Sequence, residues 1–134
     1  MDVAAARTRF AGARVARLAT LGAGGAPHLV PVTFALRDDR IVIAVDHKPK
    51  RTTSLARLRN IERDPRVSLL ADFYADDWDL LWWVRADGTA RVLDSSPLVA
   101  WLVDKYPQYN AHPPTGPVIV VDVTKWRGWA ASAG

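Results

Sequence analysis

The stretch RVARLATLGAGGAPHLVPVTFAL, residues 14–36, decides the fold. Residues 14–20 alternate polar and apolar side chains, which is the period of a half-buried β-strand. Residues 22–25, GAGG, have the composition of a turn, and residues 28–36 are rich enough in apolar and β-branched side chains for a second strand. The stretch therefore predicts a β-hairpin.

Further strands and a few helices are expected on either side of this hairpin. The expected helices cover residues 2–12, residues 53–60 and the segment from Ser95 or Ser96 to about Tyr106. The expected strands cover residues 40–45, 66–72, 80–86, 89–93 and 118–123, with a tight turn at residues 86–88. About six short antiparallel strands with two or three helices predict a mainly β protein, a closed β-barrel with flanking helices, in one domain over residues 1–134.

The composition excludes several classes of site. The chain has 134 residues, of which 49% are hydrophobic and 24% charged, and it has no cysteine, so disulfides and thiolate chemistry are excluded. The three histidines lack metal-site spacing, and the serine-hydrolase, P-loop and dinucleotide-binding glycine motifs are missing. No run approaches the roughly 20 apolar residues of a membrane helix, and the N-terminus lacks a signal-peptide core. We therefore expect a cytoplasmic protein with no metal and no membrane partner.

Positive charge is concentrated in one part of the chain. Residues 46–66 carry seven Lys and Arg side chains against three carboxylates, a net charge of +4, whereas residues 67–94 carry a net charge of −4. Such a local concentration favours a site for a small anion over a general nucleic-acid surface. We expect no nucleic-acid partner.

The strongest local chemistry lies in residues 46–54, DHKPKRTTS, where a strand passes into a helix. The start of a helix, its dipole and Lys or Arg donors together stabilise a phosphate, to which hydroxyl groups can also donate. Arg57 is expected to face the same anion, whereas Arg59 diverges from it by about 200° on a helix. The alternative is a solvated basic turn with Thr or Ser as the N-cap.

Trp82 and Trp83 are adjacent within an aromatic segment that also contains Trp78. Neighbouring residues of a strand point to opposite faces of the sheet, so one of the two rings needs a second surface, such as a partner subunit. The alternative is that both rings only fill the core and an interface.

Several motifs occur in a specific order along the chain. They are ARLAT at 16–20 with GAPHLVPV at 25–32, RLRNIERDPRV at 57–67, WVRADGTARV at 83–92, and then KYPQY at 105–109 and WRGW at 126–129. In order and spacing they resemble the pyridoxamine 5′-phosphate oxidase-like split-barrel superfamily, and within it the branch of F420-dependent oxidoreductases. Arg57 stands where that branch usually has lysine, and Leu55-Ala56 stands where it often has an Arg/Ser pair.

The resemblance implies a six-stranded antiparallel split β-barrel of the FMN-binding type, forming a homodimer with one coenzyme in each of two grooves between subunits. The implied coenzyme is the deazaflavin F420, which passes a hydride to a small, electron-poor organic acceptor. The residues implied to bind the coenzyme or line its site are Lys48, Lys50, Arg51, Thr52, Arg57, Thr20, Pro31, Thr33, Trp82 and Trp83. Tyr74 is a further candidate for the wall, and no catalytic residue is assigned.

Two other functions fit the same resemblance. An FMN-dependent oxidase or reductase would share the fold, and the surplus of cations favours the longer anion of F420 over a single phosphate. A non-catalytic carrier of flavin, F420 or heme is the second, with His28, His47 and His112 as the heme ligands to test. The sequence does not identify the physiological acceptor or the direction of reduction.

Overall fold

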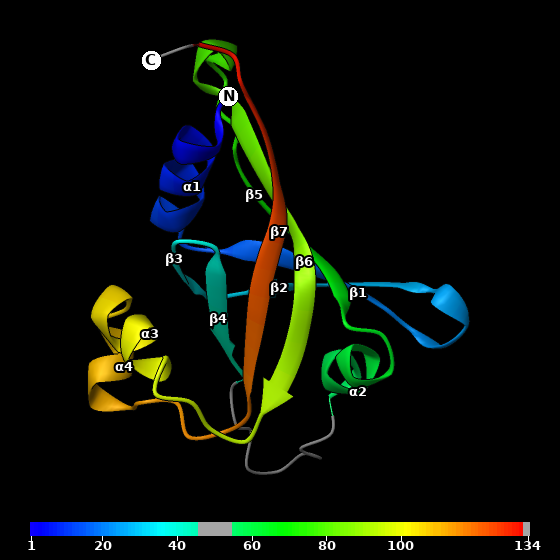
Figure 1. Ribbon diagram of the computed structural model, residues 1–134. Helices are drawn as coiled ribbons and strands as arrows, with labels where there is room; N and C mark the ends of the chain where they lie inside the picture. The colour runs from blue at the N-terminus through cyan, green and yellow to red at the C-terminus, as the bar shows by residue number, and fades with distance from the viewer. Residues whose placement is uncertain (46–54, 133–134) are drawn as a thin grey trace.

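The computed structural model of the protein describes residues 1–45 and 55–132. Its described strands form a seven-stranded antiparallel sheet in the order β2-β1-β5-β6-β7-β4-β3. The strands are β1 (Ala16–Leu21), β2 (Pro27–Val32), β3 (Ala35–Arg37), β4 (Arg40–Ala44), β5 (Arg66–Phe73), β6 (Trp82–Leu93) and β7 (Val118–Ala130). The two edge strands, β2 and β3, are consecutive in the chain, so the bend between them closes the sheet into the expected barrel (Figure 1).

Four α-helices and two short 3-10 turns complete the described chain. They are α1 (Val3–Gly12), η1 (Ala23–Gly25), α2 (Ala56–Arg63), η2 (Trp78–Leu80), α3 (Val99–Lys105) and α4 (Gln108–Ala111). α1 and α2 contribute Phe10, Leu58 and Ile61 to the core inside the barrel. α3 packs Leu102 against the outer side of β4 and β7 in a second, smaller core. None of the described helices has the length and hydropathy needed to cross a membrane.

The predicted hairpin over residues 14–36 is confirmed in its first part, where β1 pairs with β2 from Ala16 opposite Val32 to Leu21 opposite Pro27. The expectation of a continuous second strand over residues 28–36 is wrong, because the chain bends at Thr33 and Phe34. The backbone N–H of Phe34 donates to the hydroxyl of Tyr106 at 3.2 Å, and the same hydroxyl lies 3.0 Å from the carbonyl oxygen of Phe34. A side chain from the end of α3 thus replaces the ladder partners of this residue.

The turn predicted at residues 86–88 is also wrong, because β6 runs without interruption from Trp82 to Leu93. Its pairing with β7 shifts at Asp87 and Gly88, which is a β-bulge rather than a chain reversal. A Cβ atom at Gly88 would clash with the carbonyl oxygen of Asp122 on β7, so glycine permits the close approach of the two backbones. β7 extends to Ala130, seven residues beyond the predicted end at residue 123, as the partner of this long β6.

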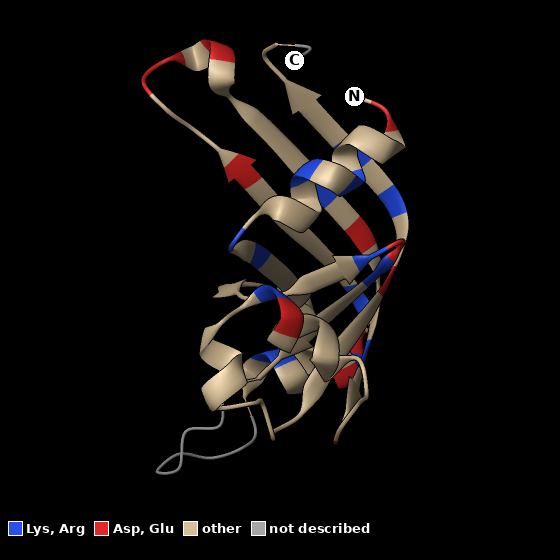
Figure 2. Ribbon diagram, turned by 90° about the vertical axis from the view of Figure 1, so that its left-hand side faces the viewer, with Lys and Arg blue, Asp and Glu red and all other residues tan. Residues whose placement is uncertain are grey.

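The predicted helix from Ser95 or Ser96 begins later, at Val99. Ser96 still accepts a hydrogen bond from the backbone N–H of Leu98 at 3.1 Å, so it stabilises the turn that leads into the helix. Acidic residues gather in the connection between β5 and β6, at the far end of the long strands (Figure 2).

Candidate functional site

The predicted anion-binding residues lie partly outside the described residues. Lys48, Lys50, Arg51 and Thr52 fall in residues 46–54, so their positions stay predictions. The chain resumes with Leu55, which is the N-cap of α2 and provides no side-chain hydrogen bond to the helix start. A Thr or Ser N-cap, the alternative explanation of this segment, is therefore wrong. Among the described residues, no side chain caps this helix start, so none of them competes with an anion for its N–H groups.

A buried polar contact fixes α2 against the barrel. The side-chain amide of Asn60 donates to the hydroxyl of Thr20 on β1 at 3.0 Å, and both residues are buried. Thr20, predicted to bind the coenzyme or line its site, thus points into the barrel and positions the helix. Arg57 is half-buried on this helix and Arg59 is exposed, so the two arginines diverge as the helical period predicts.

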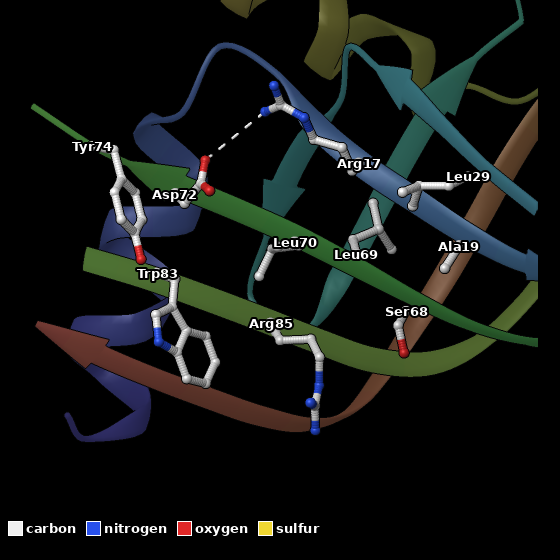
Figure 3. A pocket seen from close by; sticks show the side chains of 10 residues that line it. All are labelled: Arg17, Ala19, Leu29, Ser68, Leu69, Leu70, Asp72, Tyr74, Trp83 and Arg85. Atoms are coloured by element: carbon white, nitrogen blue, oxygen red, sulfur yellow. Dashed lines mark ion pairs between the residues drawn. The ribbon is translucent and has the colours of Figure 1, made fainter. Parts of the chain in front are cut away.

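A hollow of about 450 Å³ lies on the outer side of the sheet (Figure 3). Its floor is formed by alternate residues of β1, β5 and β6, and Tyr74 stands at one end, just after β5. The lining residues are Arg17, Ala19, Leu29, Ser68, Leu69, Leu70, Asp72, Tyr74, Trp83 and Arg85. We call the surface around it the outer face, defined by the outward-pointing residues of β1, β2, β5, β6 and the end of β7.

The two adjacent tryptophans are separated by the sheet, as predicted. Trp83 lines the hollow, whereas Trp82 packs against the barrel core under the guanidinium of Arg9, which lies 5.7 Å from the ring centroid. Trp83 therefore shares the hollow with Tyr74, and Trp82 does not.

The remaining candidates from the first hairpin occupy different places. Pro31 is exposed and lies opposite Arg17 in the β1–β2 ladder, so it is on the outer face beside the hollow. Thr33 is half-buried at the bend, where its hydroxyl lies 2.9 Å from the hydroxyl of Tyr109. Of the three residues of this hairpin predicted to bind the coenzyme or line its site, Thr20, Pro31 and Thr33, only Pro31 is on the face that carries Trp83.

Charged side chains border the apolar floor of the hollow in pairs. Arg17 lies 4.0 Å from Asp72, the ion pair marked in Figure 3, and Arg85 contacts Asp87 at 3.0 Å. The hydroxyl of Ser68 lies 2.7 Å from the same Asp87 carboxylate. Such a site can hold a flat, largely apolar molecule by its rings and orient a polar edge. Among the described residues no group of three potential metal ligands occurs.

The contributions of Leu29 and Leu70 to this face were missed by the sequence reasoning. Both are exposed, Leu29 to 67% and Leu70 to 37%. The signal was available, because in β5 the buried residues Val67, Leu69 and Ala71 alternate with outward positions, one of which is a leucine.

Comparison with known proteins agrees with this architecture. The chain resembles a conserved hypothetical protein of Mycobacterium tuberculosis, with 24% identity over 98% of this chain and 86% of the other, and a TM-score of 0.76. It resembles a heme-binding protein of Mycobacterium smegmatis, with 25% identity over 96% of this chain and 53% of the other, and a TM-score of 0.72. It also resembles an FAD-binding protein of Mesorhizobium loti, with 17% identity over 96% of this chain and 94% of the other, and a TM-score of 0.70.

No curated protein matches the sequence. The family model described as pyridoxamine 5′-phosphate oxidase, by contrast, matches residues 3–130, which is nearly the whole chain and includes every described strand. The split-barrel fold expected from the sequence is thereby confirmed. This chain belongs to the pyridoxamine 5′-phosphate oxidase family.

Proposed function

We propose that the chain is an F420-dependent oxidoreductase that works as a homodimer, with the coenzyme held between the subunits. The observation that carries the proposal is that α2, whose N-cap Leu55 provides no side-chain hydrogen bond, directly follows the basic segment in the sequence. The Asn60–Thr20 contact holds this helix on the barrel. α2 ends at Arg63, five residues before Ser68, which lines the hollow.

The residues present fit such a group. Helix-start N–H groups and Arg57 suit a phosphodiester, and the charge of +4 over residues 46–66 suits its anionic tail. When bound, reduced F420 supplies a hydride, so the protein has to bind and orient rather than transfer a proton. In this assignment Trp83 and Tyr74 hold the acceptor by its rings, and Arg17 and Arg85 bind its polar edge.

Titration of the purified protein with F420 and with FMN, followed by quenching of tryptophan and coenzyme fluorescence, tests the coenzyme. We expect tighter binding of F420, and a loss of about 10- to 100-fold in Lys50→Ala/Arg51→Ala for each charge-assisted contact removed. The matched control is Arg37→Ala/Arg40→Ala, which removes two exposed cations from the distant β3–β4 turn. Tight binding of FMN alone would assign the chain to the flavin enzymes, and equal losses in both variants would refute a local phosphate site.

Catalysis has its own test, because a coenzyme carrier would bind equally well. Oxidation of reduced F420 in the presence of a nitroaromatic acceptor should be catalysed by the wild type. It should fall in Trp83→Ala with coenzyme affinity retained, since Trp83 is assigned to the acceptor. Binding of F420 without turnover of electron-poor acceptors would favour the carrier.

Heme binding is the second candidate. The observation that favours it is His28 on β2, whose Nδ1 atom is buried and has no hydrogen-bond partner among the described residues. The similarity in fold to the heme-binding protein of Mycobacterium smegmatis also favours this candidate. Titration with hemin and a His28→Ala variant test it. A Soret shift that depends on His28, with no binding of F420 or FMN, would replace the oxidoreductase by a heme-binding protein.

A further inference from the structure

The amine of Lys105 is buried without a hydrogen-bond acceptor. Lys105 is the last residue of α3, the helix that covers β4 and β7 on one side of the barrel (Figure 1). The residue as a whole is half-buried, but its Nζ atom has almost no exposed surface and no hydrogen-bond partner among the described residues. An ammonium group has three N–H donors and is strongly hydrated in water. The site therefore leaves the amine without the acceptors that its protonated form requires.

Aromatic rings and a second cation surround this amine. Nζ lies 3.8 Å from the ring centroid of Phe34 and 5.2 Å from that of Tyr106. The guanidinium carbon of Arg14 lies 5.7 Å from the same Tyr106 ring, and Nη1 of Arg14 donates to the backbone carbonyl of Lys105 at 3.0 Å. The ring of Tyr109 packs edge-on against Tyr106, with the centroids 5.7 Å apart. We call these five residues the α3 corner.

No carboxylate in residues 1–45 and 55–132 pairs with either cation of the α3 corner. Asp104, the residue before Lys105, is exposed and contacts Arg37 at 3.0 Å instead. A positive charge on the Lys105 side chain is opposed by Arg14, whereas a negative charge there would be matched by it. The α3 corner is therefore better suited to an anionic form of this lysine than to its ammonium form.

We propose that Lys105 is a carbamylation site, at which carbon dioxide adds to Nζ and the carbamate formed is stabilised by the guanidinium of Arg14. The lone pair of the neutral amine forms a C–N bond to the carbon, one C=O π bond opens onto oxygen, and the nitrogen releases one proton to solvent. The step has no leaving group and transfers no electrons to an acceptor. It replaces two neighbouring cations by an ion pair, and it does not depend on the coenzyme.

The same surroundings make the amine reactive near neutral pH. A neutral amine attacks carbon dioxide and an ammonium group does not, and burial, with a smaller effect of Arg14, lowers the pKa of Lys105 from 10.5 to about 8. At pH 8 about half of this amine is neutral, against roughly 0.4% of an ordinary lysine side chain. Carbon dioxide is small and uncharged, so it enters an apolar corner more readily than larger electrophiles do. The flexible four-carbon stem then allows the carbamate to turn from the Phe34 ring toward Arg14.

Chemical trapping tests the assignment on the unaltered protein. The wild type is equilibrated at pH 8 with carbon dioxide and bicarbonate and treated with triethyloxonium, which converts a carbamate into a stable ethyl ester. Because α-amino groups are also partly neutral near pH 8, peptide mass spectrometry then locates the modified residue. We expect the trapped group on Lys105 and at least about tenfold less on Lys125, an exposed lysine of β7. An unmodified Lys105, or equal yields on the two lysines, would overturn the proposal.

Two arginine variants test the countercharge. Arg14→Gln removes the guanidinium and should lower the yield on Lys105 several-fold, because the carbamate loses its partner and the amine loses a neighbouring cation. The matched control is Arg127→Gln, the same change at an exposed position of β7, which should leave the yield unchanged. Circular dichroism verifies that both variants are folded. Equal yields in the two variants would overturn the assignment of Arg14 as the partner.

Carbon-13 NMR gives a second readout that needs no trapping reagent. With labelled carbon dioxide, the wild type should show a carbamate signal that grows as the pH is raised from 7 to 9 at a fixed concentration of dissolved carbon dioxide. The signal should be missing from Lys105→Arg and retained in Lys125→Arg. A signal that persists in Lys105→Arg, or is lost in both variants, would place the carbamate elsewhere and refute the proposal.

Discussion

Replacing Tyr106 by phenylalanine removes one oxygen atom from the point where the barrel bends. The Tyr106 hydroxyl accepts from the N–H of Phe34 at 3.2 Å and lies 3.0 Å from the carbonyl oxygen of Phe34 and 2.9 Å from that of Arg14. The hydroxyl has one proton, so it can donate a full hydrogen bond to only one of these two carbonyl oxygens at a time. Tyr106 is 6% exposed and Phe34 is fully buried, so water cannot readily replace the hydroxyl.

The size of the effect follows from the groups left without a partner. The variant orphans one buried N–H and at least part of one buried carbonyl, and each such group costs about 1–3 kcal/mol. We expect the free energy of unfolding to fall by about 2–4 kcal/mol. The phenyl ring retains the apolar contacts, including the one with Tyr109, whose ring centroid lies 5.7 Å away.

Urea denaturation followed by circular dichroism measures this loss as a lower midpoint with an unchanged m-value. Tyr109→Phe is the matched control. Within the described part of the chain, the Tyr109 hydroxyl forms a hydrogen bond of 2.9 Å with the hydroxyl of Thr33, which is half-buried. This substitution should cost about 0.5–1.5 kcal/mol, as an ordinary hydrogen bond does. If Tyr106→Phe cost no more than Tyr109→Phe, the hydroxyl would not be what holds the bend.

Three further substitutions test the packing around the site. Thr20→Val removes the acceptor of the buried Asn60 amide and should lower the free energy of unfolding, measured in urea, by about 1–3 kcal/mol. Thr20→Ser should retain the hydrogen bond, so equal stabilities of the two variants would contradict this role. Gly88→Ala forces β6 and β7 apart and should lower the free energy of unfolding by about 1–3 kcal/mol. In the control Gly12→Ala the new Cβ atom has no neighbour within 4 Å, so equal melting temperatures of the two variants would refute the close approach at Gly88. Burial, with a smaller effect of a nearby arginine, lowers the pKa of Lys105 from 10.5 to about 8. The unfolded chain then binds more protons than the folded one between about pH 8 and 10.5, so the free energy of unfolding should rise with pH across that window in the wild type. It should not rise in this way in Lys105→Met, and parallel pH profiles of the two proteins would contradict the lowered pKa of Lys105.

The sequence predicted what depends on neighbours along the chain. The β1–β2 hairpin follows from local alternation and a glycine turn, and η1 contains Gly24 and Gly25 at φ of 73° and 82°, which glycine adopts readily. The bend at Phe34 could not be predicted in this way, because its cause is a tyrosine 72 residues further along the chain. The same holds for the bulge at Gly88, whose reason is a backbone oxygen on β7.

The candidate site shows the same division. The alternation of strand residues predicted that Trp82 and Trp83 lie on opposite faces of the sheet. Only the folded structure shows that Trp82 packs against the core and Arg9, whereas Trp83 lies on the outer face. The inward direction of Thr20 was readable, since it falls in phase with the buried Ala16 and Leu18 on β1. The basic residues 46–54 lie outside the described residues, so the predicted phosphate contacts there stay predictions.

One part of the barrel's outer surface is covered by a helix and another part is not. On one side, Val42 of β4 and Val120 of β7 point outward and are fully buried, because α3 covers them with Leu102 and Tyr106. On the other side, Leu29 and Leu70 point outward from strands of the same sheet, and no described helix lies over them. Burying a leucine side chain is worth about 1.5–3 kcal/mol, so leaving this face bare costs the isolated subunit stability that α3 provides opposite. In the homodimer proposed above, a second subunit would supply the missing cover, so dilution below the dimer dissociation constant should weaken coenzyme binding and thermal stability together.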